Sequence, residues 1–141
     1  MINTKIYKQI YLLAEELLAA DQAQDQPQFD ALYDELKALC NTHENTDKDH
    51  PEQWETLADF TSDLDLALAL YDKALVKAEA VNSKDHMASI AFSKAELQQQ
   101  LGELQAAIES LQYAKQHANK IEDKEFKVEI DDKLQALLKM V

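Results

Sequence analysis

The side chains best suited to chemistry in this sequence lie in one polar segment, THENTDKDH, residues 42–50. Imidazole nitrogens and carboxylate oxygens, donors that divalent metal ions accept, are supplied there by His43, Asp47, Asp49 and His50. Their spacing matches no established metal-binding pattern, and a metal site needs ordered surroundings to orient its ligands. Because so polar a segment is typical of a mobile loop, we expect no metal ion there.

Other catalytic signals are missing from the sequence. It contains no glycine-rich phosphate cradle, nucleophile elbow or paired-carboxylate motif. The single cysteine, Cys40, is interpreted as a small core residue at a helix end in a reducing compartment; the alternative is a reactive thiol. His86 and His117 are expected to be ordinary surface or boundary residues. We therefore predict a protein that is not an enzyme and needs no cofactor.

Negative charge is the stronger signal. The formal net charge is −13, and between His43 and Asp72 nine acidic residues face one base, Lys48. The chain has no arginine, so it lacks the forked side chains that usually recognise phosphate and guanine. We therefore expect no nucleic-acid binding, because a polyanion would be repelled. Either the acidity serves solubility alone, or it forms a surface for a basic partner.

Aromatic residues occur at helical spacing and are interpreted mainly as core. The tyrosines concerned are Tyr7, Tyr11, Tyr33, Tyr71 and Tyr113. Trp54 belongs to a short helix at the start of the acidic stretch, with Leu57 and Ala58 on the same inward face. It is also a candidate interface anchor that carboxylates would surround, since Trp often anchors protein interfaces.

The elements that must position these residues are predicted to be α-helices. One glycine and two prolines leave few helix breakers, and apolar residues recur at three- and four-residue steps in seven segments. We expect one all-α domain over residues 1–141, with helix pairs over about 4–42, 51–82 and 84–121 and a capping helix over 124–140. No stretch approaches the roughly eighteen apolar residues of a membrane span, and the N-terminus lacks the features of a signal peptide. A cytoplasmic location without membrane contact is therefore expected.

A repeat underlies this helical pattern. The segment TSDLDLALALYDKALVKAEAV, residues 61–81, aligns with LGELQAAIESLQYAKQHANKI, residues 101–121, at an offset of about forty residues. The alignment pairs Ala67 with Ala107, Leu68 with Ile108, Tyr71 with Leu111, Ala74 with Ala114 and Ala78 with Ala118. Recurring alanines allow a neighbouring helix to approach closely, while the large residues between them fill the grooves.

The second copy resembles the second half of a tetratricopeptide repeat. The glycine, alanine, large residue and alanine of that family's pattern correspond to Gly102, Ala107, Leu111 and Ala114. The earlier copy keeps Ala67, Tyr71 and Ala74 but has Ser62 in place of the glycine. The resemblance implies a TPR-like α-solenoid of about three antiparallel helix pairs plus a C-terminal capping helix, whose first helices line a concave groove that binds peptides or domains.

The resemblance also places four residues in that groove: Glu52, Thr56, Phe92 and Glu96. They lack the lysine and asparagine with which some members of the family grip a terminal carboxylate, and they carry the opposite charge. Such a groove suits a basic partner. The predicted partner-binding residues are Glu44, Asp47, Asp49, Glu52, Trp54, Glu55, Asp59, Phe92 and Glu96.

Two functions are consistent with these features. A small, acidic helical-repeat protein resembles a bacterial immunity protein, an inhibitor that binds and neutralises a basic, nuclease-type toxin. Alternatively, the chain is a TPR-like scaffold or chaperone that receives a peptide or export substrate in its groove. In both cases we expect a protein partner and a monomer outside the complex, because the last helix is predicted to expose Glu125, Glu129, Asp131 and Lys133.

Overall fold

The computed structural model describes residues 4–141, which fold into seven α-helices without a β-strand. The helices are α1 (Thr4–Gln22), α2 (Gln26–His43), α3 (Pro51–Asp59), α4 (Leu64–Ala80), α5 (Lys84–Gln100), α6 (Leu104–Ala118) and α7 (Lys124–Leu138). The predicted all-α class is confirmed, and the predicted helix ends agree to within a few residues. No helix within residues 4–141 combines the length and apolar character that crossing a membrane requires.

Local capping signals fix where the helices begin. Asp25, Asp63, Ser83 and Asp123 each accept a hydrogen bond from a backbone N–H in the first turn of α2, α4, α5 and α7. At the other end of α5, Gly102 has φ +79°, and the amides of Gly102 and Glu103 return to the carbonyls of Gln99 and Gln98. This closure turns the chain sharply into α6.

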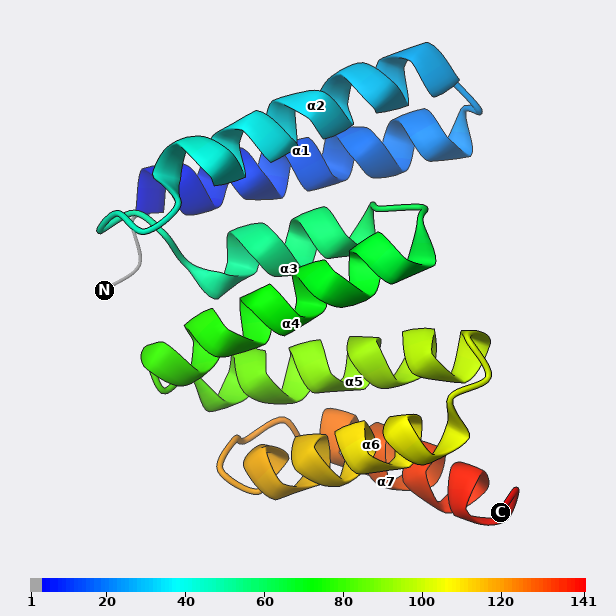
Figure 1. Cartoon of the computed structure of the whole chain (residues 1–141). Helices are drawn as coiled ribbons and strands as arrows, with labels where there is room; N and C mark the ends of the chain where they lie inside the picture. The colour runs from blue at the N-terminus through cyan, green and yellow to red at the C-terminus, as the bar shows by residue number, and fades with distance from the viewer. Residues whose placement is uncertain (1–3) are drawn as a thin grey trace.

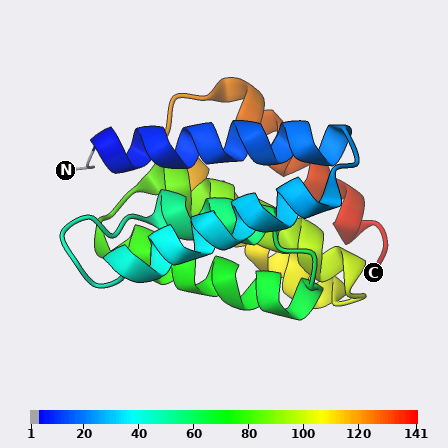
Figure 2. The ribbon, with the colours of Figure 1, turned by 90° about the horizontal axis from the view of Figure 1, so that it is seen from above.

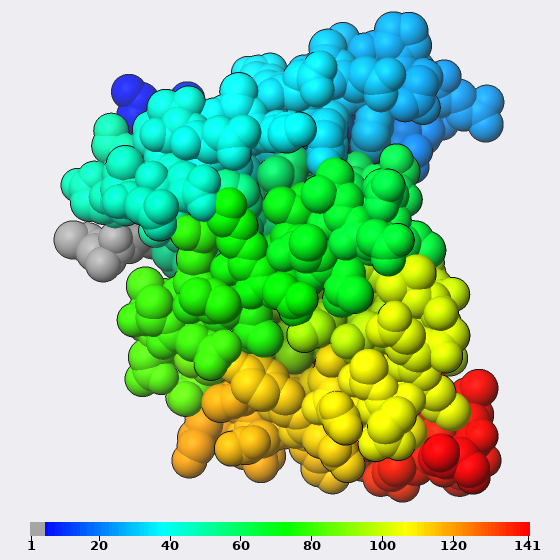
Figure 3. Space-filling model, in the orientation of Figure 1, coloured from blue at the N-terminus to red at the C-terminus, as the bar shows by residue number. Residues whose placement is uncertain are grey.

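The helices lie side by side in chain order (Figure 1), and each contacts its neighbours in sequence. Helix α3 additionally contacts both α1 and α5. Seen from above, α1 and the start of α7 lie on one side of the molecule and α4 on the other (Figure 2). In the space-filling view, successive parts of the chain form consecutive bands whose side chains fill the spaces between helices (Figure 3).

The core contains most of the residues that helical periodicity predicted to be buried, but Tyr7 and Tyr11, which the sequence indicated as core, are 45% and 55% exposed. The paired alanines Ala67, Ala74 and Ala78 of α4, and Ala107, Ala114 and Ala118 of α6, are all buried. Tyr71 and its counterpart Leu111 are buried beside them. Cys40 is fully buried, and burial raises the pKa of its thiol to about 12, which agrees with a core role. Four of the five aligned pairs are therefore buried in both copies; in the fifth, Leu68 is partly buried and Ile108 fully so.

The outer face of α7 differs from the prediction. Glu125 and Glu129 are exposed as expected, but Asp131 and Lys133 are only partly exposed. Two apolar residues, Val128 and Leu138, are 59% and 40% exposed. The last helix therefore does not end the molecule with a wholly polar face.

Candidate functional site

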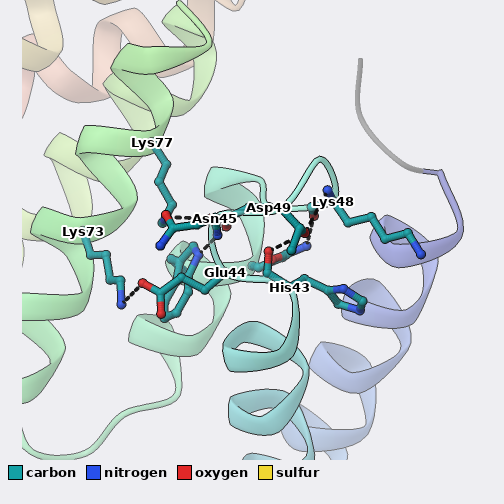
Figure 4. Close-up of polar contacts among 10 residues, drawn as sticks. His43, Glu44, Asn45, Lys48, Asp49, Lys73 and Lys77 are labelled. Carbon is teal, nitrogen blue, oxygen red and sulfur yellow. Dashed lines mark hydrogen bonds and ion pairs between the residues drawn. The ribbon is translucent and has the colours of Figure 1, made fainter.

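The residues of the predicted partner-binding surface fall into two groups with different surroundings. The first group surrounds Trp54, which is only 1% exposed. Figure 4 shows two carboxylates of this group, Glu44 and Asp49, with Lys73 and Lys77 beside them. The indole N–H of Trp54 donates to Asp49 Oδ1 at 2.7 Å, and Lys73 Nζ lies 4.0 Å from the centroid of its ring. Trp54 faces inward as predicted; its role as an interface anchor stays a prediction, and its burial does not favour that role.

Lysines from α4 neutralise the carboxylates of this first group. Lys77 Nζ is 2.6 Å from Asp49 Oδ2, and Lys73 Nζ is 2.5 Å from Glu44 Oε2. Burial alone would raise the pKa of Asp49, but hydrogen bonds from Lys77, Asn45 and Trp54 outweigh it and lower the pKa. Glu44 and Asp49 are therefore engaged within the fold, whereas a partner would need free charges.

These contacts also anchor residues 42–50, which the sequence indicated as a mobile loop. The Asn45 amide donates to Asp49 Oδ2 at 2.8 Å, and the Thr46 hydroxyl donates to the His43 carbonyl at 2.7 Å. His50 Nδ1 accepts the Glu52 amide and caps α3. Asp49 and His50 therefore serve structural roles, and the group of potential metal ligands found among residues 4–141 includes none of the four residues named in this segment.

The second group is an acidic strip, which we define as Glu52, Glu55 and Asp59 of α3 with Glu96 of α5. The three residues of α3 are three and four positions apart and so share one face of the helix. None of the four carboxylates forms an ion pair with a lysine of residues 4–141; Glu52 and Glu55 contact only His86 in this way. The strip therefore retains most of its negative charge.

Mutual repulsion of the carboxylates contributes to raised pKa values within the strip. Burial raises the pKa of Asp59 to about 6, and the charges of Glu55, Glu52 and Glu96 add to this effect. The hydroxyl of Tyr71, which donates to Asp59 Oδ1 at 2.5 Å, opposes the rise. Burial likewise raises the pKa of Glu52, with a further contribution from the charge of Glu55. A cation placed here would relieve this repulsion.

His86 and Ser89, on the first turns of α5, complete one end of the strip. His86 Nδ1 lies 3.3 Å from Glu55 Oε1 and 3.4 Å from Glu52 Oε2. The Ser89 hydroxyl donates to Glu55 Oε2 at 2.6 Å. The hydrogen bond with Glu55 raises the pKa of His86 although burial opposes it. Within residues 4–141, Glu52, Glu55 and His86 form a group of three side chains able to hold a metal ion, with ligand atoms within 4.8 Å of one another.

At the other end, the strip borders a pocket of about 420 Å³. Asp59 and Glu96 line it together with Tyr71 and Ser93, so its wall combines carboxylates with hydroxyl groups. A pocket of this character can receive one basic or polar side chain.

Aromatic residues flank the strip. Tyr7 of α1 is 45% exposed and lines a shallow crevice with His50 and Glu52. Phe92 of α5 is half-buried against Phe126 of α7, with ring centroids 5.6 Å apart. Thr56, the remaining predicted groove residue, is buried. The surface around the acidic strip is thus built from α1, α3, α5 and α7.

Sequence reasoning did not find His86 and Ser89, which lie 31 and 34 residues from Glu55. A signal did exist, because residues 86, 89, 93 and 96 have the same helical spacing as residues 52, 55 and 59. Two such faces on helices in contact would be expected to meet. Comparisons with protein-family models, curated proteins and solved structures find no match for this chain.

Proposed function

We propose that the chain is a non-enzymatic protein-binding module whose acidic strip docks a basic surface of another protein. The observation that carries this proposal is that, within residues 4–141, lysines pair with acidic residues elsewhere in the fold but not with those of the strip. Lys73, Lys77, Lys94 and Lys115 each form an ion pair with an acidic residue elsewhere in the fold. The strip has no lysine, although its carboxylates repel one another. A lysine or arginine from a partner would supply the missing charge.

The TPR-like arrangement belongs to this proposal. In it, α1–α2, α3–α4 and α5–α6 are the helix pairs, α7 is the cap, and the first helices of the pairs line one binding face. The contacts of α3 with both α1 and α5 support this arrangement. So does the origin of the residues around the strip, since Tyr7 and Phe126 come from the first and last helices.

Within this class we favour an immunity-type inhibitor of a basic, nuclease-type toxin. An acidic strip without lysine partners, on a chain of net charge −13, would accelerate association with a basic protein and discriminate against acidic ones. The supporting features are charge and fold alone, and the same fold can carry many functions.

The second candidate is a scaffold or chaperone that binds an extended peptide. The pocket of about 420 Å³ beside Asp59 and Glu96 favours it, because such a pocket could hold one side chain of a peptide lying along the strip. An inhibitor should bind one partner tightly with an association rate that falls steeply with salt. A peptide scaffold should bind several clients weakly.

The first experiment is affinity capture on the tagged protein from the cells that produce it, at low and moderate salt, followed by mass spectrometry. A single stoichiometric basic protein, toxic when expressed alone, would support the inhibitor. Several weakly held clients would support the scaffold. Capture of acidic proteins only would contradict a role for the strip.

A pair of charge-matched variants then tests the surface. Glu52→Lys, Glu55→Lys and Asp59→Lys are combined in one protein, and the exposed Asp34, Glu109 and Glu129 are changed to lysine in another. Both change the net charge equally, so only a local effect can separate them. We expect the strip variant to lose at least about 100-fold in affinity, against a few-fold loss in the control. Equal losses in the two variants would refute docking on the strip.

A further inference from the structure

We propose that Glu52, Glu55 and His86 form a three-ligand site for a divalent transition-metal ion, with Zn²⁺ as the best match. The two glutamates come from α3 and the histidine from α5, so the ion would join two helices. This inference goes beyond the proposed function and does not depend on it, because it concerns the isolated chain.

The spacing of the three ligand atoms suits a small tetrahedral ion. Zinc binds histidine nitrogen and carboxylate oxygen at about 2.0–2.2 Å, so neighbouring ligands of a tetrahedral site lie about 3.3–3.5 Å apart. His86 Nδ1 is 3.3 Å from Glu55 Oε1 and 3.4 Å from Glu52 Oε2. Two edges of the tetrahedron are thus already formed, and all three atoms lie within 4.8 Å of one another.

Neighbouring groups hold the ligands in this arrangement. The Ser89 hydroxyl binds Glu55 Oε2 at 2.6 Å and leaves Oε1 directed toward His86. The ring of His50 meets that of His86 edge to face, with centroids 5.0 Å apart and an interplanar angle of 81°. Such outer contacts fix ligand orientation and raise metal affinity. His50 is not counted as a ligand, since its Nδ1 already accepts the Glu52 amide.

Charge and access also favour a cation. Two carboxylates face one imidazole, and the remaining acids of the strip, Asp59 and Glu96, lie on the same surface without lysine partners. The side chains of Glu52, Glu55 and His86 are 30%, 11% and 22% exposed. The site is therefore shielded enough for strong electrostatic attraction and open enough for a water molecule as fourth ligand.

A proton competes with the metal for His86. An imidazole must be neutral to bind a metal, so protons and metal ions compete for the same ring nitrogen. Metal binding should therefore release a proton and become weaker between pH 8 and pH 6. A purely structural ion pair between His86 and the glutamates would show no such metal dependence.

The test is calorimetric titration of the metal-free, full-length chain with ZnCl₂ at pH 7.5 and pH 6. We expect saturable 1:1 binding that weakens at pH 6. His86→Gln and Glu55→Gln should each lose at least about tenfold in affinity. His43→Gln, in the segment that the sequence singled out, and His117→Gln should bind as the wild type does.

A second readout covers variants that fold poorly. Four-coordinate Co²⁺ has strong visible absorption, so Co²⁺ bound to the wild type reports the ligand geometry directly. Glu52→Gln, at the most exposed ligand, should keep the wild-type circular dichroism and reduce this absorption. Absence of saturable Zn²⁺ binding by the wild type would overturn the proposal. So would binding that His86→Gln and Glu55→Gln leave unchanged.

Discussion

Removing the carboxylate of Asp49 should destabilise the fold, because three donors depend on it. Asp49→Ala leaves the Trp54 indole N–H, the Asn45 amide and the Lys77 ammonium without their acceptor. The Asp49 side chain is 8% exposed and that of Lys77 is 17% exposed, so water replaces the lost contacts only in part. The free energy of unfolding should therefore fall markedly.

The size of this loss follows from the contacts. Breaking a buried ion pair by removing one partner costs about 3–5 kcal/mol, and an unpaired buried donor about 1–3 kcal/mol. Because Lys77 can turn toward solvent, we expect the low end, about 3 kcal/mol. For a chain of 141 residues this corresponds to a fall in Tm of about 6–12 °C. Asp49→Asn, which keeps an acceptor but not the charge, should lie between the wild type and Asp49→Ala.

The assay is urea unfolding followed by circular dichroism at pH 7. Asp47→Ala is the matched control, since Asp47 is exposed and forms no side-chain hydrogen bond or ion pair with the residues that the structure describes. It should change the free energy of unfolding by less than about 0.5 kcal/mol. The lowered pKa of Asp49 adds a pH test. Its stabilisation is present above the unfolded-state value of 3.8 and is lost as the pH falls through the folded-state value.

Two results would refute this reasoning. If Asp49→Ala unfolds at the same urea concentration as the wild type, the contacts around Trp54 contribute nothing to stability. If Asp47→Ala loses as much as Asp49→Ala, the effect reflects general charge rather than these contacts.

Three further predictions test the strip, the thiol and the repeat. Because the pKa of Asp59 is about 6 in the fold and 3.8 unfolded, the contribution of Asp59 to stability falls as the pH rises between these values. Asp59→Asn should therefore raise the free energy of unfolding at pH 7.5 by about 1 kcal/mol, a value kept low because solvent partly screens the charge. This stabilisation, measured by thermal unfolding, should vanish near pH 4. Buried Cys40, with its pKa raised to about 12, should react with a thiol reagent at pH 8 only in denaturant; rapid labelling of the native chain would contradict its core role. Ala74→Leu should overpack the buried face of α4 and lower the free energy of unfolding in urea by about 2 kcal/mol. Ala69→Leu, at an exposed position of the same helix, should change it little.

Helix positions and inward faces could be predicted because their signals are local. Capping residues such as Asp25 and Ser83, and the glycine at 102, mark helix ends within a few residues of the chain. The burial of Trp54 follows from the same short-range periodicity. The shared face of Glu52, Glu55 and Asp59 could be predicted for the same reason.

Contacts between helices could not be predicted, because they depend on how one helix is rotated against another. The sequence placed Glu44 and Asp49 in a partner surface, yet Lys73 and Lys77 of α4 neutralise them. It placed His86 at an ordinary boundary, yet two carboxylates of α3 lie beside it. A polar composition likewise predicts a loop at residues 42–50 but does not reveal the contacts that anchor it.

The order of contacts along the chain has a consequence for folding kinetics. All the more extensive helix–helix contacts join helices that are adjacent in sequence or separated by one helix. Only short stretches of chain must therefore be closed to form each contact, and topologies of this kind fold in microseconds to milliseconds. Local unfolding should begin at α1 and α7, because these helices have neighbours on one side only. Amide hydrogen exchange should therefore slow progressively toward α3, α4 and α5.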